Sequence, residues 1–317
     1  MKVNVKFKNS IIYRIYFRVK NLFFYRIRKI KNWTLYYLIY VFPGIYRPSS
    51  EPFISGDTFR KMANHVFDET KGFNPNMVKD GDIIFLKADM IETFFKFFHQ
   101  KIESRYVLLS HNSDFSFNLE NQKYLDDKVI HWFAQNINFE ADEKFSLLPI
   151  GLENRRYLKN GLIYHFNKYK NYEKKQLVLL SFNEKTNISR LKVKEALKNN
   201  KLITSQMFKN SDSYKKTLSE SMYNLCPPGN GLDTHRFWES LLLNTLPIVV
   251  RSSFTSNLEK LDIPALYLDK WTDLNEYKEN ELKSLYMEKI NKNDLTSYVQ
   301  FNYWKELILN SKSSIVT

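Results

Sequence analysis

The residues best suited to chemistry are gathered in one stretch, Cys226–Val250 (CPPGNGLDTHRFWESLLLNTLPIVV). A proline- and glycine-rich loop, which can continue neither a helix nor a strand, leads into a predicted helix. The free N–H groups at a helix N-terminus attract phosphate. His235 and Arg236 stand in the first turn, where cations oppose the helix dipole. The pair is therefore poorly chosen for helix stability alone and indicates an anion in front of the loop.

A carboxylate one helical turn further on extends this pattern. Glu239 follows Arg236 by three residues and so lies on the same side of the helix. It is placed to accept both hydroxyls of a ribose while Arg236 and the loop hold a diphosphate. Asp233 or Thr234 can cap the helix with a side-chain oxygen. Together these residues indicate a nucleotide-sugar site, whereas a glycine-rich loop with one arginine would indicate only an ordinary surface loop.

The segment PPGNGLDTHRFWESLLLNTLPIVV resembles the donor-site segment of exostosin-like glycosyltransferases, which have the two-domain GT-B fold. Shorter matches to bacterial members follow in the expected order at 55–59 (SGDTF), 110–114 (SHNSD), 131–136 (HWFAQN) and 148–154 (LPIGLEN). The resemblance implies transfer of a sugar from a nucleotide donor without an obligatory metal. It leaves the sugar and the acceptor open.

Short apolar runs that alternate with amphipathic segments predict an α/β fold with two Rossmann-like domains facing a cleft. The predicted strands are 82–87, 106–110, 145–150, 177–181, 202–204, 222–225, 246–250 and 265–268. The predicted parts are a basic amphipathic arm (1–48), an acceptor-side domain (49–165), a nucleotide-sugar-binding domain (166–290) and a C-terminal helix returning to the first domain (291–317).

Inversion at an anomeric carbon needs a base on the side of the sugar opposite the phosphate, and we expect it in the first domain. The candidates there are Asp57, His111 and Asp114. His131 and Trp132 are candidates for an acceptor subsite, with packing as the alternative. The residues expected to bind the donor are Asn183, Arg190, Gly229, Asn230, Gly231, Asp233, His235, Arg236 and Glu239. Glu153 and Asn154 are assigned to either a hinge or the cleft.

The spacing of His and Cys residues shows no metal-ligand cluster, so the expected co-substrate is a UDP- or GDP-linked sugar without an obligatory metal. The one cysteine, Cys226, excludes an internal disulfide and suggests a reducing compartment. It ends an apolar run and is expected to be buried rather than nucleophilic.

The net charge of +14 is concentrated in residues 1–50, which hold eleven Lys or Arg and no acid. An apolar stripe at helical spacing with a basic face suits an anionic membrane surface. Docking on the globular body and nucleic-acid binding are the alternatives. The uncharged stretch 32–46 is too short to span a bilayer.

These features predict a cytoplasmic glycosyltransferase (hexosyl- or pentosyltransferase) peripheral to the inner face of the plasma membrane. We expect it to act on a glycan or lipid-linked saccharide in cell-surface polysaccharide or lipopolysaccharide biosynthesis and not to bind nucleic acid. The alternatives are a non-catalytic membrane-docked or nucleic-acid-binding protein and a polyol-phosphate or phosphoglycosyl transferase of similar fold.

Overall fold

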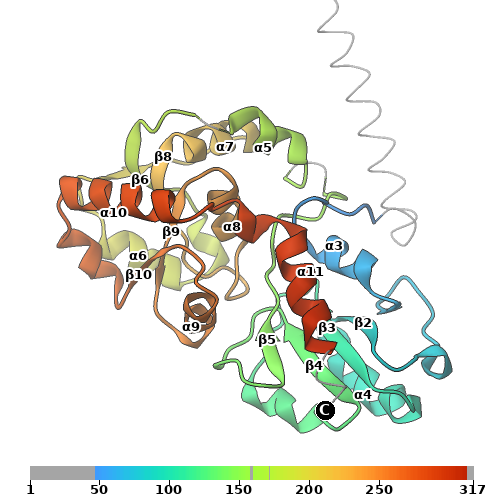
Figure 1. The fold of residues 1–317 in the computed structure, drawn as a ribbon. Helices are drawn as coiled ribbons and strands as arrows, with labels where there is room; N and C mark the ends of the chain where they lie inside the picture. The colour runs from blue at the N-terminus through green and yellow to red at the C-terminus, as the bar shows by residue number, and fades with distance from the viewer. Residues whose placement is uncertain (1–46, 158–159, 171, 313–317) are drawn as a thin grey trace, which may run out of the picture. The chain divides into compact units, whose positions relative to one another are not determined.

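The computed structural model describes residues 47–157, 160–170 and 172–312. The chain divides into the units Met1–Arg47 and Pro48–Thr317. The predicted basic arm (1–48) therefore lies almost wholly outside the described residues. Everything below concerns the second unit, which contains both predicted α/β domains (Figure 1). None of the helices in the described ranges combines the length and apolar character needed to cross a bilayer.

The first sheet has five parallel strands that lie side by side in chain order. They are β1 (His65–Phe67), β2 (Asp82–Lys87), β3 (Tyr106–His111), β4 (Val129–Ala134) and β5 (Phe145–Leu147). The central strands are nearly continuous apolar runs, as expected for a parallel sheet covered on both faces. The helices of this half are α3 (Gly56–Met62) and α4 (Ile91–Phe97).

The second sheet is also parallel and has the order β10-β9-β8-β6-β7. Its strands are β6 (Gln176–Leu180), β7 (Ile203–Ser205), β8 (Ser221–Leu225), β9 (Leu246–Val250) and β10 (Leu266–Leu268). The chain runs outward in one direction from β6 to β7 and in the other from β8 to β10, so the strand order reverses between β6 and β8. In open α/β sheets ligands bind at the carboxyl ends of the strands beside such a reversal.

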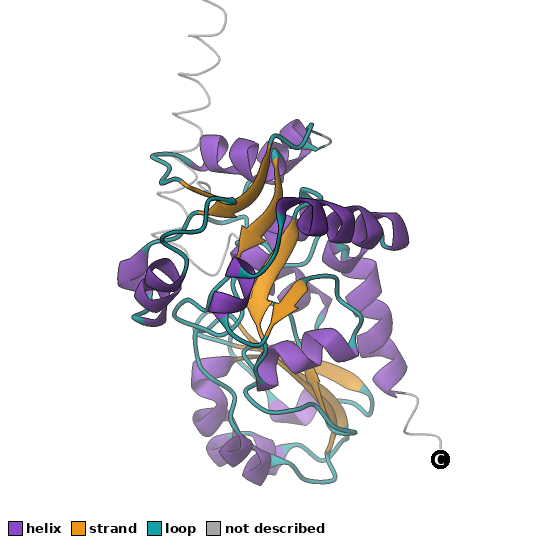
Figure 2. Cartoon of the chain, turned by 90° about the vertical axis from the view of Figure 1, so that its left-hand side faces the viewer, coloured by secondary structure: helices purple, strands orange, loops and turns teal. Residues whose placement is uncertain are grey.

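Helices flank the strands of the second sheet on both sides (Figure 2). They are α6 (Ser189–Ala196), α7 (Ser211–Ser219), α8 (His235–Leu242), α9 (Ser253–Lys260) and α10 (Glu279–Lys292). α5 (Ile163–Tyr169) lies in the connection between the sheets. The apolar side of α8 is buried, with Phe237, Leu241 and Leu242 almost inaccessible.

The last described helix, α11 (Phe301–Asn310), returns to the first half of the chain. Figure 1 shows it (red) near α3 and the first sheet. The Phe301 ring meets the Phe59 ring of α3 edge-on at 6.0 Å between centroids. The Phe301 N–H donates to the Pro52 carbonyl at 2.8 Å, and the Ile54 N–H donates to the Val299 carbonyl at 3.0 Å. The end of the chain therefore helps to hold its first described segment.

The predicted fold class is confirmed: the structure is α/β with two five-stranded parallel sheets, which is consistent with twin Rossmann-like domains of the GT-B type. Of the two interpretations of His131 and Trp132, the structure favours packing over an acceptor subsite, because both residues belong to β4 and bond to neighbouring strands. Trp132 is fully buried and donates from Nε1 to the Ser110 hydroxyl at 2.9 Å, while His131 bonds to the Ser146 hydroxyl on β5.

Candidate functional site

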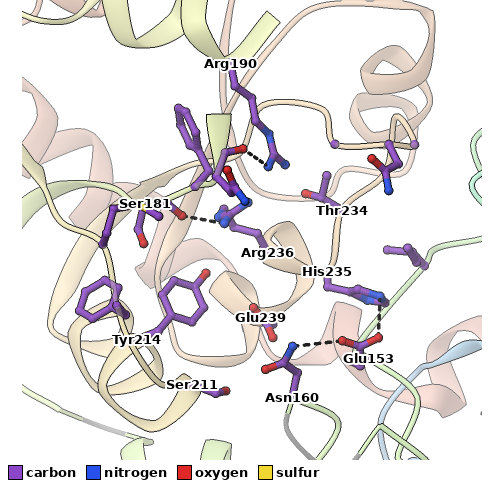
Figure 3. A pocket seen from close by; sticks show the side chains of 18 of the residues that line it. Glu153, Asn160, Ser181, Arg190, Ser211, Tyr214, Thr234, His235, Arg236 and Glu239 are labelled. Atoms are coloured by element: carbon purple, nitrogen blue, oxygen red, sulfur yellow. Dashed lines mark hydrogen bonds and ion pairs between the residues drawn. The ribbon is translucent and has the colours of Figure 1, made fainter. Parts of the chain in front are cut away.

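A pocket of about 420 Å³ opens at the carboxyl ends of β6 and β8, where the strand order reverses. Its volume is within the usual range for small-molecule sites. The second half lines it with 181–183 after β6, 207–211 after β7, and the glycine-rich loop with the start of α8. Asp114, Ile150 and Glu153 line it from the first half, and Figure 3 shows Glu153 among the lining side chains. It therefore lies between the two sheets, as the sequence predicts for a cleft.

Two arginines from different helices meet at one end of the pocket. Arg190 of α6 donates from Nε to the Pro228 carbonyl at 2.8 Å and from Nη1 to the Asn183 carbonyl at 3.1 Å. Arg236 of α8 donates from Nη2 to the Ser181 carbonyl at 2.6 Å. Both guanidinium groups face the Phe182 ring, at 5.6 and 6.0 Å from its centroid. The side chains thus converge on the loops after β6 and β8.

These two cations have no carboxylate partner within salt-bridge distance among the described residues. Arg190 is only 5% exposed, and Arg236 Nε is buried without a hydrogen-bond partner there. Burial lowers the pKa of Arg190 to about 10, and the charge of Arg236 adds to the effect. The site therefore holds one desolvated and one half-buried positive charge close together, an arrangement that favours an anion between them.

Glu239 of α8 also lines the pocket, and it is 7% exposed. Its carboxylate makes no hydrogen bond or ion pair with any residue in the described ranges. Beneath it, the fully buried Lys215 of α7 donates to the Asn160 carbonyl at 2.9 Å. Burial lowers the pKa of Lys215, and the charge of Glu239 partly offsets that shift. Figure 3 shows Glu239 between the arginines and the Glu153–Asn160 pair.

The glycine-rich loop is packed too closely for larger residues at two positions. A Cβ on Gly229 would lie 3.1 Å from Arg190 Nη2, and one on Gly231 would lie 2.6 Å from Asn136 Nδ2. The Gly229 N–H donates to the Gly231 carbonyl at 2.9 Å, and the Gly229 carbonyl accepts from Asn187 Nδ2 at 2.7 Å. The expectation that the loop offers its amides to a phosphate is therefore wrong for Gly229, whose N–H is already used.

Asp233 and His235 join the two halves of the chain. Asp233 is 3% exposed and accepts from the Ile150 N–H at 2.7 Å and from Trp238 Nε1 at 2.8 Å. Burial raises its pKa to about 6. Neither Asp233 nor Thr234 caps α8 with its side chain, contrary to the prediction, because both Asp233 oxygens are engaged elsewhere. His235 donates from Nδ1 to the Gly151 carbonyl at 2.8 Å.

Of the three predicted bases, the structure brings only Asp114 to the pocket. His111 is 1% exposed, donates from Nε2 to the Pro149 carbonyl at 3.0 Å and accepts at Nδ1 from the Asn112 N–H. Burial lowers its pKa to about 4, so it is neutral with both ring nitrogens engaged. The Asp57 side chain is fully buried, 3.7 Å from Arg156 Nε. These two expectations are corrected.

Several lining residues were not among the predicted donor-binding residues. Ser181 and Phe182 follow β6, as the predicted residue Asn183 does. Their position at the carboxyl end of a predicted strand was the sequence signal that could have identified them. The segment 207–211 and Tyr214 had no sequence signal, because they reach the pocket only through the packing of β7 and α7 against β6. Glu153 lies in the LPIGLEN match, where the choice between hinge and cleft was open. The structure places it in the pocket wall.

No protein-family model and no curated protein sequence matches the chain. Among solved structures, a UDP-forming α,α-trehalose-phosphate synthase from Burkholderia xenovorans is 9% identical with a TM-score of 0.46, over 77% of this chain and 75% of that one. An E. coli structure described as trehalose-6-phosphate bound with UDP-2-fluoro glucose is 10% identical, with a TM-score of 0.42 and coverage of 76% and 73%.

An α1,3-fucosyltransferase with GDP-fucose is 13% identical, with a TM-score of 0.30 and coverage of 72% and 70%. Scores at this level carry no functional inference, which must rest on the residues of the site. The resemblance to exostosin-like enzymes stays a prediction.

Proposed function

We propose that the chain is a glycosyltransferase that uses a nucleotide-sugar donor, bound in the pocket at the β6/β8 reversal. One observation carries the proposal: two guanidinium groups without a carboxylate partner, one buried and one half-buried, line the same pocket as a buried carboxylate that makes no hydrogen bond or ion pair with the described residues. A nucleoside diphosphate offers both complements, because its phosphates are anionic and its ribose presents two hydroxyl donors. Few other small ligands supply both.

The arginines support the leaving-group part of this assignment. Burying a charge costs several kcal/mol unless a partner compensates it, and here two like charges share one pocket. A diphosphate between Arg190 and Arg236 would neutralise both positive charges through charge-assisted hydrogen bonds. The same contacts would strengthen as negative charge develops on the departing diphosphate. They would therefore stabilise the transition state more than the bound donor.

Glu239 supports the nucleoside part. A buried carboxylate without a donor is costly, whereas the two hydroxyls of a ribose supply two donors at the spacing of one carboxylate. The predicted roles of Arg190, Arg236 and Glu239 in donor binding are therefore kept in the proposal.

The experiment is a calorimetric titration of the protein with UDP, GDP, CMP and ADP. Arg236→Gln and Glu239→Gln should each weaken the preferred nucleotide by about 1.5–3 kcal/mol, the range for hydrogen bonds to charged groups. That loss corresponds to roughly 10-fold to 150-fold in Kd. Arg251→Gln is the matched control, because Arg251 is exposed in the same half and pairs with Glu259 and Asp269.

Unchanged affinity in both variants, with the fold intact by circular dichroism, would place the nucleotide elsewhere. If no nucleotide binds to the wild type, the loop and its arginines hold only a structural anion. The alternative of a non-catalytic membrane-docked or nucleic-acid-binding protein would then be favoured.

The finer parts of the proposal rest on the sequence. We infer an inverting, metal-independent transferase of exostosin type that acts on a glycan or lipid-linked saccharide for a cell-surface polysaccharide. The basic arm would hold it at the anionic inner face of the plasma membrane. A polyol-phosphate or phosphoglycosyl transferase stays the alternative within enzymes, and the products of a reaction with labelled donor would separate the two.

A further inference from the structure

Glu153 is a carboxylate from the first half of the chain that faces the nucleotide pocket. It lies in the connection that follows β5. Its neighbours there are fixed by bonds to distant parts of the chain, so the position of Glu153 is set by the fold.

Four bonds hold this connection. The Pro149 carbonyl accepts from His111 Nε2 at 3.0 Å, and the Ile150 N–H donates to Asp233 at 2.7 Å. The Leu152 N–H donates to the Ile54 carbonyl at 2.9 Å, and Asn154 Oδ1 accepts from the Asp57 N–H at 2.7 Å. His111 and Asp57, expected to be bases, thus act as supports for the segment that carries Glu153.

Gly151 makes the path of this connection possible. Its φ is +65°, a conformation that other residues rarely adopt, and a Cβ there would lie 2.5 Å from the Ile54 carbonyl oxygen. The Gly151 carbonyl in turn accepts from His235 Nδ1. His235 Nε2 lies 3.8 Å from Glu153 Oε1, which is too far for a hydrogen bond but within ion-pair distance when the imidazole carries a second proton.

The carboxylate of Glu153 is therefore oriented and partly open. Oε2 accepts from Asn160 Nδ2 at 3.2 Å, while Oε1 has no hydrogen bond within 3.5 Å from the described residues. The side chain is 25% exposed, so a hydroxyl can reach it from the pocket. Figure 3 shows Glu153 and Asn160 at the side of the pocket away from Arg190.

Asp114, the other carboxylate of the first half in the pocket wall, is placed differently. It is exposed, and its Oδ2 accepts from Asn230 Nδ2 at 3.1 Å, within the glycine-rich loop. It therefore stands on the side where the diphosphate is held. A base for inversion must act on the opposite face of the sugar.

We propose that Glu153 is the general base of the transfer reaction, an inference that rests on the proposed function. The acceptor hydroxyl gives its proton to Glu153 Oε1, and its oxygen forms the new bond to the anomeric carbon. The bond from that carbon to the phosphate oxygen breaks, and its electron pair leaves with the diphosphate, which faces Arg190 and Arg236. Asn160 positions the carboxylate.

The test uses the full-length protein with UDP-glucose, UDP-N-acetylglucosamine and GDP-mannose as donors and water as the acceptor. Release of UDP or GDP gives the turnover rate, and calorimetry with the free nucleotide gives its Kd. Loss of a general base typically costs 10²- to 10⁴-fold in rate, so Glu153→Gln should lower kcat by about that factor. Its nucleotide Kd should stay within about twofold, because the substitution removes a proton acceptor and no contact with the nucleotide.

Two variants serve as controls. Glu120→Gln changes an exposed glutamate of the first half and should leave turnover unaltered. Asp114→Asn removes the competing carboxylate, and its loss of kcat should be much smaller than that of Glu153→Gln. The acidic side of the pH–rate profile should differ between the wild type and Glu153→Gln. Formate should restore part of the activity of Glu153→Ala.

A Glu153→Gln protein that turns over at the wild-type rate overturns the proposal, as does a large loss in Asp114→Asn alone. So does a wild type that binds a nucleotide but hydrolyses none of the three sugars. These results leave the nucleotide site standing. Failure of every nucleotide to bind would instead refute the proposed function, and the base assignment with it.

Discussion

Gly231→Ala tests whether the contact between the glycine-rich loop and the end of β4 is as tight as the structure indicates. A Cβ at this position would lie 2.6 Å from Asn136 Nδ2 and 2.8 Å from Asn136 Oδ1. The Asn136 amide cannot easily move aside. Asn136 is fully buried, and its backbone has a φ of 57°. Its side-chain Oδ1 also accepts from the Asp233 N–H at 2.9 Å.

The expected loss of stability has two parts. Forcing a methyl group into a packed region costs about 1–3 kcal/mol. Displacing the Asn136 amide also breaks its bond to Asp233, a net loss of about 0.5–1.5 kcal/mol. Gly231→Ala should therefore lower the free energy of unfolding by about 2–4 kcal/mol. Because Asn136 and Gly231 belong to different halves of the chain, nucleotide affinity should fall as well.

Urea denaturation followed by circular dichroism measures the effect, with Gly72→Ala as the matched control. A Cβ on Gly72 would meet nothing within 4 Å, so that variant should be neutral or up to about 1 kcal/mol more stable. If the two variants differ by less than about 0.5 kcal/mol, the spread of ordinary surface substitutions, the Asn136 amide moves freely and the reasoning fails.

Three further predictions concern pH, metal and membrane. Burial raises the pKa of Asp233 to about 6 from an ordinary 3.8, so the folded chain keeps a proton that the unfolded chain has lost between these values. The contribution of this group to the free energy of unfolding should thus fall by about 3 kcal/mol as pH rises through that window. The difference in free energy of unfolding between wild type and Asp233→Asn, measured in urea, should therefore decrease as pH rises from about 4 to about 6. A difference that does not change with pH would contradict this prediction. Donor turnover should survive EDTA because arginines neutralise the leaving group, whereas loss restored by Mn²⁺ would reveal a missed metal site. A chain beginning at Pro48 should keep nucleotide binding but no longer sediment with anionic vesicles, since each basic residue near such a surface contributes about 1 kcal/mol. If full-length protein ignores the vesicles at low salt, the membrane assignment of the arm is wrong.

The strands could largely be predicted because buried parallel strands are continuous apolar runs. The run DIIFLK coincides with β2, and the runs at 106–110 and 246–250 differ from β3 and β9 by at most one residue. β4 was missed because His131 interrupts its apolar pattern with a polar side chain that bonds across to β5. Local pattern was therefore enough for most of the framework.

The site residues from the first half of the chain were predicted less well than those from the second half. Arg236 and Glu239 are one turn apart on one helix, so local geometry alone places them together. His111 and Asp57 follow strand or loop ends in the expected way, but sequence does not show that their side chains turn inward. Glu153 reaches the pocket because the N–H of the neighbouring Ile150 donates to Asp233, which follows Ile150 by eighty-three residues. A position that depends on such distant contacts leaves no local pattern to detect.

The return of the chain's end to its beginning has a consequence for synthesis on the ribosome. Residues 52–54 are bonded to 299–301, and Phe59 packs against Phe301. A nascent chain emerges from its N-terminus, and domains normally fold as they appear. Here the first sheet can form early, but α3 gains its contact with Phe301 only after residues 299–301 have been translated. The strands of the second sheet precede these residues in the chain, so both sheets are synthesised before this contact can form.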